Sequence, residues 1–185
     1  MLNYGFSLLE MLFTLLISSI ILFAGLTFYP SFQLSITHVY QTYRVSEVID
    51  QTMNSIIKDI KRAGFIANDP TTNTIKSYEI NAKNNCIIIR YDSNSNGHWI
   101  LESDDPQYVD VFAYRFNQNN LEYKTGANKC SGSAWEKLFD PKEIKINQFY
   151  INQIDNIFTI TISASLKNKP SINYQQTYRV KNENG

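Results

Sequence analysis

The apolar residues of this chain are concentrated in one long run near its N-terminus. Between Glu10 and Arg44 there is no charged residue, and residues 11–29 are apolar except for scattered Ser, Thr and Tyr hydroxyls. A helix of about 20 apolar residues is long enough to cross a hydrocarbon core of about 30 Å. The pattern therefore predicts a hydrophobic, membrane-spanning helix over residues 6–30.

Beyond Pro30 the apolar residues recur three or four positions apart, which predicts an amphipathic stem helix over residues 31–63. Pro30 lacks a backbone donor and is expected to kink the helix, or to break it. Lys61 and Arg62 suit a carboxyl-terminal turn and Gly64 suits the cap, so the helix is placed at about residues 6–62. The apolar stem positions are Ile36, Val39, Tyr43, Ile49, Met53, Ile56 and Ile60.

From Phe65 onward the sequence changes to β-branched and aromatic residues punctuated by Asn, Gly and Asp, which is typical of antiparallel strands. Phe158, Ile160 and Ile162 alternate with polar residues, so their strand is expected to bury one face against the stem helix. No repeat or low-complexity linker divides residues 64–185, which are predicted to form one globular head. The candidate strands are residues 77–81, 86–91, 98–102, 109–117, 121–125, 143–150, 156–167 and 173–181.

The charged residues give little support for other classes of function. Lys and Arg number 17 and Asp and Glu also number 17, so no direct nucleic-acid binding is predicted. His38 and His98 are far apart, and no catalytic set has persuasive spacing. We therefore expect no enzyme and no cofactor.

Residues 92–97 match the opening of an EF-hand loop, with oxygen-bearing side chains at positions one, three and five and glycine at position six. The twelfth position is Ser103 rather than Glu, and no helices are predicted beside the loop. A hairpin turn is therefore favoured over a calcium site, and no metal ligand is predicted.

The chain has two cysteines, Cys86 and Cys130, and they do not form a zinc-like grouping. In an exported domain they are expected to pair, closing a loop of about 45 residues and stabilising the fold by roughly 4 kcal/mol. The alternative is two buried free thiols.

A carboxylate stands at the start of the apolar run. An acidic residue in a membrane helix is costly, so Glu10 needs a functional reason. If a peptidase cut between Gly5 and Phe6, the new α-amino group would lie one helical turn from Glu10, which would supply its counter-charge. In a filament the same carboxylate could meet the amine of a neighbouring subunit and fix the register between them.

Two simpler interpretations of the N-terminus remain. A removable secretory signal would have a basic start, a shorter apolar region and a small-residue cleavage site, and residues 26–30 are a poor cleavage site. An ordinary single-pass anchor would let Glu10 reach the membrane interface.

Residues 5–10, Gly-Phe-Ser-Leu-Leu-Glu, followed by the apolar run, resemble the processing and N-methylation motif of type IV pilins and type II secretion pseudopilins. The resemblance implies an α+β, pilin-like fold, in which a long N-terminal α-helix with a membrane-spanning first half packs on an antiparallel β-sheet head. It also implies that residues 1–5 are a cleaved leader, that Gly5 is recognised by the peptidase, that Phe6 becomes the N-methylated first residue, and that Glu10 is the assembly glutamate. The leader departs from the common pattern because it has no Lys or Arg, so an N-in orientation rests on the short leader staying inside.

Several segments in order, including Lys-Asp-Ile-Lys-Arg-Ala-Gly-Phe at residues 58–65 and Cys-Ser-Gly-Ser-Ala-Trp at residues 130–135, resemble the minor pilins of the PilW or prepilin-peptidase-dependent protein B kind. More distantly they resemble the J-type pseudopilin of type II secretion. This implies a subunit that the prepilin peptidase and N-methyltransferase processes in the bacterial inner membrane, with its head in the periplasm. It would join other minor pilins, the major pilin and the assembly platform, help to initiate the pilus and lie at or near its tip.

Two alternatives stay open at this point. A type II secretion minor pseudopilin would have the same motif and differ in its partners. A membrane-anchored adhesin would use exposed aromatic residues such as Trp99 and Trp135 to bind a ligand, although aromatics at alternating strand positions more often belong to the core.

Overall fold

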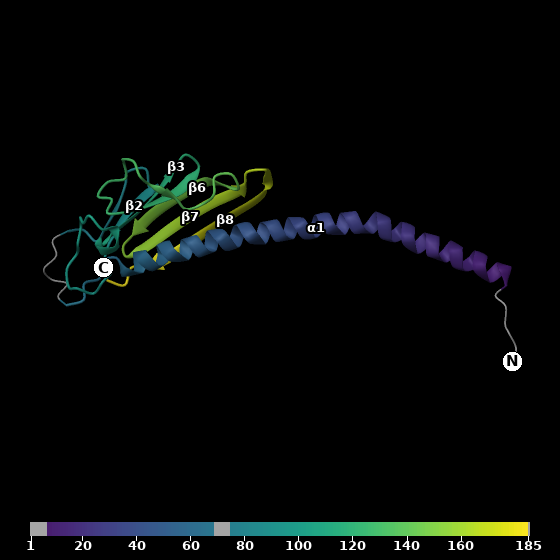
Figure 1. Cartoon of the computed structure of the whole chain (residues 1–185). Coiled ribbons are helices and arrows are strands. Elements are labelled where there is room, and N and C mark those ends of the chain that lie inside the picture. Colours follow the sequence, from purple (N-terminus) through teal and green to yellow (C-terminus); the bar gives the residue numbers. More distant parts are fainter. Residues whose placement is uncertain (1–6, 69–74, 185) are drawn as a thin grey trace. The chain divides into compact units, whose positions relative to one another are not determined.

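The computed structural model describes residues 7–68 and 75–184 (Figure 1). The chain divides into two compact units, Met1–Gln41 and Thr42–Gly185, and each is described by itself. The predicted cleavage residues Gly5 and Phe6 lie outside the described residues.

The described part of the first unit is the amino-terminal part of α1, a helix that runs from Leu8 to Arg62. By length and composition, α1 is able to cross a membrane. The Ser and Thr hydroxyls of its apolar run donate to the helix's own backbone carbonyls, for example Ser18 Oγ to the Thr14 carbonyl at 2.6 Å, so they can enter hydrocarbon with their donors satisfied. The helix is continuous through Pro30, without a break, and the kink at that residue stays a prediction.

In the second unit, α1 buries one face in the head. The five buried side chains are three or four positions apart and share one core with residues of both sheets. Four of them were expected from the sequence, whereas the earlier stem positions Ile36, Val39 and Tyr43 are exposed. The buried side chains are Val45, Ile49, Met53, Ile56 and Ile60.

The carboxyl end of α1 is capped as the sequence predicts. Gly64 adopts a φ of 90°, a left-handed conformation that glycine takes without steric cost. Its amide donates to the carbonyl of Arg90 at 2.9 Å, so the cap also joins the helix end to a strand end.

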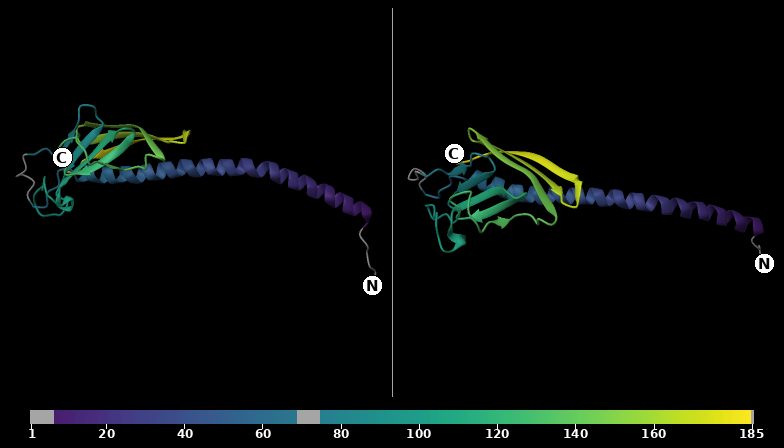
Figure 2. Two further views of the ribbon diagram at one scale, coloured as in Figure 1. Left: turned by 45° about the horizontal axis from the view of Figure 1, so that its top comes forward. Right: turned by 90° about the horizontal axis from the view of Figure 1, so that it is seen from above.

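Eight strands form two antiparallel sheets in the described part of the chain (Figures 1 and 2). The first has the order β1 (Tyr78–Ile80), β2 (Cys86–Arg90), β3 (Val111–Asn117), β4 (Asn120–Thr125) and β5 (Glu136–Lys137), and the second has the order β6 (Ile144–Ile154), β7 (Ile157–Leu166) and β8 (Lys169–Lys181). One short 3-10 helix, η2 (Pro106–Tyr108), precedes β3.

The alternating strand predicted from residues 156–167 is β7, and its buried residues belong to the same core as the stem helix. Phe158 meets Tyr78 of β1 edge to face, with ring centroids 4.8 Å apart, so this core also joins the two sheets. The expected packing of the β7 face on the stem is therefore confirmed, and the described chain has the α+β architecture of a long helix on antiparallel sheets.

The strand predicted at residues 98–102 is wrong. The Ile100 amide donates to the Asp110 carboxylate at 2.9 Å, and the Trp99 indole donates to the Phe65 carbonyl at 3.0 Å. The Asp110 carboxylate thus takes a backbone amide that a sheet would have used, the Trp99 side chain is held at the helix exit, and the segment is a loop. The sequence also gave no sign of the two-residue strand β5.

Cys86, at the start of β2, and Cys130, in the loop after β4, form the predicted disulfide, with Cα atoms 6.2 Å apart. The loop is also held by Arg115 of β3, whose Nη1 donates to the carbonyls of Cys130 at 3.0 Å and Gly132 at 3.2 Å. The disulfide therefore joins the loop to the first sheet next to a second, polar attachment.

Candidate assembly surfaces of the helix and the head

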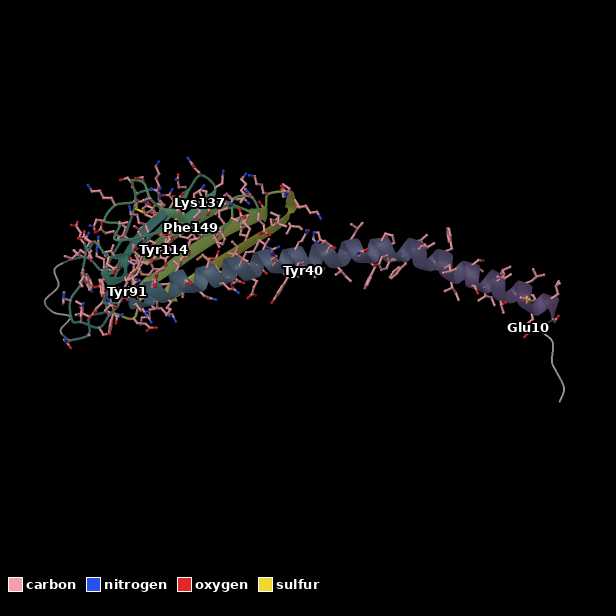
Figure 3. All side chains as sticks on the ribbon, viewed as in Figure 1. Glu10, Tyr40, Tyr91, Tyr114, Lys137 and Phe149 are labelled. Atoms are coloured by element: carbon pink, nitrogen blue, oxygen red, sulfur yellow. A yellow bond between two sulfur atoms is a disulfide. The ribbon has the colours of Figure 1, made fainter. Side chains whose placement is uncertain are left out.

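Glu10 lies in the first turn of α1 and is exposed (Figure 3). The Ser7 carbonyl accepts hydrogen bonds from the amides of Glu10 at 3.0 Å and Met11 at 3.2 Å, which starts the helix. A carboxylate in this turn interacts favourably with the positive end of the helix dipole. The position suits the predicted role, and pairing of Glu10 with an α-amino group stays a prediction.

The first unit presents apolar side chains all around the helix. Leu8 is 79% exposed, Phe23 71% and Leu26 74%. An apolar surface of this extent is not stable in water and has to be covered by lipid or by other apolar helices. The amino-terminal part of α1 is therefore an anchoring and packing element.

In the head, the stem helix is held to the first sheet by the half-buried carboxylate of Asp59 and two buried tyrosines, a contact that sequence reasoning did not anticipate. Asp59 accepts a hydrogen bond from Tyr114 Oη at 2.6 Å and another from Tyr91 Oη at 3.0 Å. Both tyrosines are 5% exposed. Their hydroxyls are satisfied by one helix side chain, so the contact fixes the rotation of the helix against the sheet.

A second carboxylate, that of Asp50, attaches the stem helix to the second sheet. Asp50 accepts from Tyr174 Oη at 2.6 Å and from Tyr178 Oη, and both tyrosines come from β8. Asp50 and Asp59 are nine positions apart on α1, or two and a half turns. The head part of the helix is thus attached to both sheets by the same chemistry.

Burial changes the titration of Asp59 and of the tyrosines around it. Desolvation raises the pKa of Asp59 above its ordinary range, although the Tyr114 and Tyr91 hydroxyls and the Arg62 charge partly offset it. Burial, together with the Asp59 charge, also raises the pKa of Tyr91 and Tyr114, and it raises that of the neighbouring Tyr123 to about 12. The tyrosines therefore remain neutral donors across the physiological range.

Replacing Asp59 should change how stability depends on pH. Since its pKa is higher in the folded protein, the native state holds a proton that the unfolded state has lost, and stability falls as pH rises from about 4 towards the raised pKa. Asp59→Asn keeps an oxygen acceptor without the charge, so this fall should disappear. Chemical unfolding of the detergent-solubilised chain between about pH 4 and pH 7, followed by tryptophan fluorescence, measures the difference from the wild type.

Asp59→Leu is the matched comparison. It leaves two buried phenol hydroxyls without their acceptor, at a cost of about 1–3 kcal/mol for each. If Asp59→Asn kept the wild-type pH slope, the slope would have to come from another group.

The candidate calcium loop is built as a turn. Asp92 is 2% exposed, and its carboxylate accepts backbone hydrogen bonds from Gly97 at 2.8 Å, Asn96 at 3.0 Å and Ala67 at 3.2 Å. Burial favours a raised pKa, but these N–H groups together outweigh it and hold the pKa of Asp92 below its usual range. Both carboxylate oxygens thus hold the loop's own backbone. Across the described residues, no group of three or more His, Cys, Asp and Glu side chains could hold a metal ion.

The two tryptophans considered for ligand binding make structural contacts. Arg115 stacks over Trp135 at 4.2 Å and pairs with the buried Glu122 at 2.7 Å, while the Trp99 indole binds the chain just after α1. Arg115 and Glu122 are directly opposite in the β3–β4 register. The short Asn-rich turn at residues 117–120 could have shown this cross-strand pair in the sequence.

Comparisons with known proteins agree with this anatomy. The family model described as prepilin peptidase-dependent protein B matches residues 38–182. The prepilin peptidase-dependent protein B of Escherichia coli K12 is 28% identical over 181 residues, which cover 95% of this chain and 94% of that protein. A type IV-like pilin from Thermus thermophilus has the same fold with a TM-score of 0.50 and 8% identity, over 76% of this chain and 97% of that one.

The apolar helix, the antiparallel head and a family match over most of the chain lead to one assignment. The chain belongs to the prepilin peptidase-dependent protein B family and is a pilin-like minor prepilin.

Proposed function

We propose that this protein is a minor subunit of a type IV pilus, processed by the prepilin peptidase, that helps to initiate assembly and lies at or near the filament tip. The observation that carries the proposal is the sequence motif from Gly5 to Glu10, whose glutamate lies in the first turn of a helix with apolar side chains exposed on every side. A structural role also agrees with the pilin-like family to which the chain belongs.

The proposed sequence of events starts in the inner membrane, with the leader inside and the head in the periplasm. The peptidase cuts between Gly5 and Phe6, and methylation of the Phe6 amine leaves a group that still carries a proton and a positive charge. The chain then moves from lipid into a filament, where other apolar helices replace the lipid around α1. The partners would be other minor pilins, the major pilin and the assembly platform.

Glu10 would act in that transfer. In a low-dielectric core, a carboxylate or an ammonium group left unpaired carries a large desolvation cost, which only direct contact between the two groups offsets. The pair therefore selects one axial register between neighbouring helices. Contacts between apolar helix surfaces stabilise association at many relative positions of two helices, whereas this ion pair favours one of those positions.

The first experiment is the intact mass of the protein from cells with and without the prepilin peptidase. We expect the loss of residues 1–5 and the gain of one methyl group on Phe6 when the enzyme is present. Gly5→Leu should block the cut, and Asn3→Ala, in the same leader, should not. A chain that keeps Met1 in peptidase-positive cells would overturn the proposal and leave an ordinary anchored domain.

A further inference from the structure

Each of the two sheets has two edge strands, and three of these four edges offer little to another chain. β1 and β5 are the edges of the first sheet, and they have only three and two residues. β6 is one edge of the second sheet, and turns of the first sheet cover it. The Ile146 amide donates to the Asn119 carbonyl at 2.9 Å, and the Ile151 amide donates to the Asn84 carbonyl at 2.8 Å. Short and covered edges are two ways in which proteins avoid pairing with foreign strands.

The fourth edge strand, β8, is long and open. It has 13 residues, and its pairing with β7 is regular from Asn173 to Lys181. Residues 171–178 contain no charged residue and no proline. The devices that usually blunt an edge strand are therefore missing from most of this one.

The hydrogen bonds between β7 and β8 show which backbone groups of β8 point away from the sheet. In an antiparallel pair, residues that bond the partner strand alternate with residues whose N–H and C=O groups point outward. The Asn182 amide donates to the Asn156 carbonyl at 3.0 Å, so residue 182 is of the first kind. The Oγ1 atoms of Thr161 and Thr177 lie 3.1 Å apart, as expected for the closer, second kind of pair. The even-numbered residues of β8 therefore bond β7, and the odd-numbered residues point their backbone groups outward.

We call the odd-numbered residues from 173 to 181 the β8 edge. Among the described residues, their backbone groups have no hydrogen-bond partner, and their side chains are exposed. The stem helix does not cover them, since Asp50 bonds Tyr174 and Tyr178 on the opposite face of β8. A row of donors and acceptors with the spacing of a strand is matched by another extended backbone. The residues of the β8 edge are Asn173, Gln175, Thr177, Arg179 and Lys181.

The geometry of the head disfavours a second copy of this chain as the source of that backbone. Asp50 is bonded to Tyr174, and further along both elements the Lys61 carbonyl accepts from Asn184 Nδ2 at 3.1 Å. β8 and the head part of α1 therefore run in the same direction. An antiparallel β8–β8 pair would point the two helices in opposite directions, although both start in one membrane. A parallel pair would place the cations of the two edges side by side.

We propose that the β8 edge binds an extended strand from the head of a different pilin subunit, so that the second sheet continues from one head into the next. This rests on the proposed function, because assembly brings the heads of different pilins together. Arg179 and Lys181 occupy one end of the edge, so the partner strand carries carboxylates opposite this end and uncharged polar residues opposite the other. A strand that runs against its own helix, or that carries this charge pattern, avoids both problems of a second copy.

The test replaces Thr177 of the full-length, tagged chain with the photo-reactive amino acid p-benzoylphenylalanine, in peptidase-positive cells that make the other pilins. A differently tagged copy of the same chain is expressed beside it. We expect a cross-linked product with another pilin, and mass spectrometry should place the cross-link on a strand of that pilin's head. The same amino acid at Gln148 is the matched control, because Gln148 is exposed on β6, whose edge is covered. It should give no such product.

A proline substitution tests the role of the backbone. Gln175→Pro removes an outward N–H group and keeps the bonds to β7, so the head should still fold, and the yield of the cross-link at Thr177 should fall about tenfold. Gln175→Ala removes the side chain, keeps the N–H group and should leave the yield unchanged. Denaturant unfolding checks that the proline variant is folded.

A charge reversal tests the basic end without altering the backbone. Arg179→Glu together with Lys181→Glu should also lower the yield about tenfold, because the carboxylates of the partner strand would then face like charges. This variant decides the question if Gln175→Pro does not fold.

The proposal is overturned if the processed chain gives no product from Thr177, or if the product contains the second tag instead of another pilin. It is also overturned if Gln148 cross-links to the same pilin equally well, or if the charge reversal leaves the yield unchanged. Intact mass of the same samples separates the two levels of the proposal. A processed chain without the cross-link overturns strand pairing alone, whereas a chain that keeps Met1 overturns the proposed function as well.

Discussion

Removing the disulfide with Cys86→Ser and Cys130→Ser together should lower the free energy of unfolding by roughly 4 kcal/mol. The bond links residues 44 positions apart, so its loss frees a long loop in the unfolded chain. In the folded head the Cys130 loop also loses its attachment to β2, and the contacts of Arg115 with the Cys130 and Gly132 carbonyls remain to hold it. Folding is expected to persist, with a markedly lower denaturant midpoint.

Denaturant unfolding of the detergent-solubilised protein, followed by tryptophan fluorescence, measures this change. Reducing the wild type should reproduce the result of the double substitution, and the same reductant should leave the double variant unchanged. A decrease below about 1 kcal/mol would mean that the loop is already ordered in the unfolded chain or that the remaining polar contacts hold it.

Glu10→Leu should abolish incorporation into filaments while leaving the chain in the membrane and still cleaved. An apolar side chain at this position removes the cost of an acidic residue in the bilayer, so insertion should be at least as efficient. What is lost is the proposed partner for the α-amino group of a neighbouring subunit, and with it the selection of one register. We expect at least a tenfold smaller share of the protein in the sheared filament fraction, on the order of the effect of a lost close ion pair.

Three further variants make this result specific. Glu10→Gln keeps the shape without the charge and should fail like Glu10→Leu, whereas Glu10→Asp should retain part of the wild-type incorporation. Ser18→Ala removes a hydroxyl that only bonds its own helix, and it should assemble normally. Wild-type incorporation of Glu10→Leu would show that the apolar surface of α1 is sufficient for assembly.

Local sequence determined the elements of this fold whose cause is itself local. The apolar run required a membrane-length helix, the cations and glycine at residues 61–64 set its end, and the alternation in β7 chose the buried face of that strand. The processing motif is also local, so Gly5, Phe6 and Glu10 could be proposed without coordinates. Each of these signals depends on residues within a few turns of one another.

Tertiary structure alone decided which distant groups meet. Asp59 is 55 residues from Tyr114, and Asp50 is 124 residues from Tyr174. No helix or strand periodicity in the sequence relates each carboxylate to the hydroxyl that donates a hydrogen bond to it. The same is true of residues 98–102, where the Asp110 carboxylate takes the amide that a strand would have used. Burial favours these contacts, because a polar group removed from water loses free energy unless the fold brings it a partner.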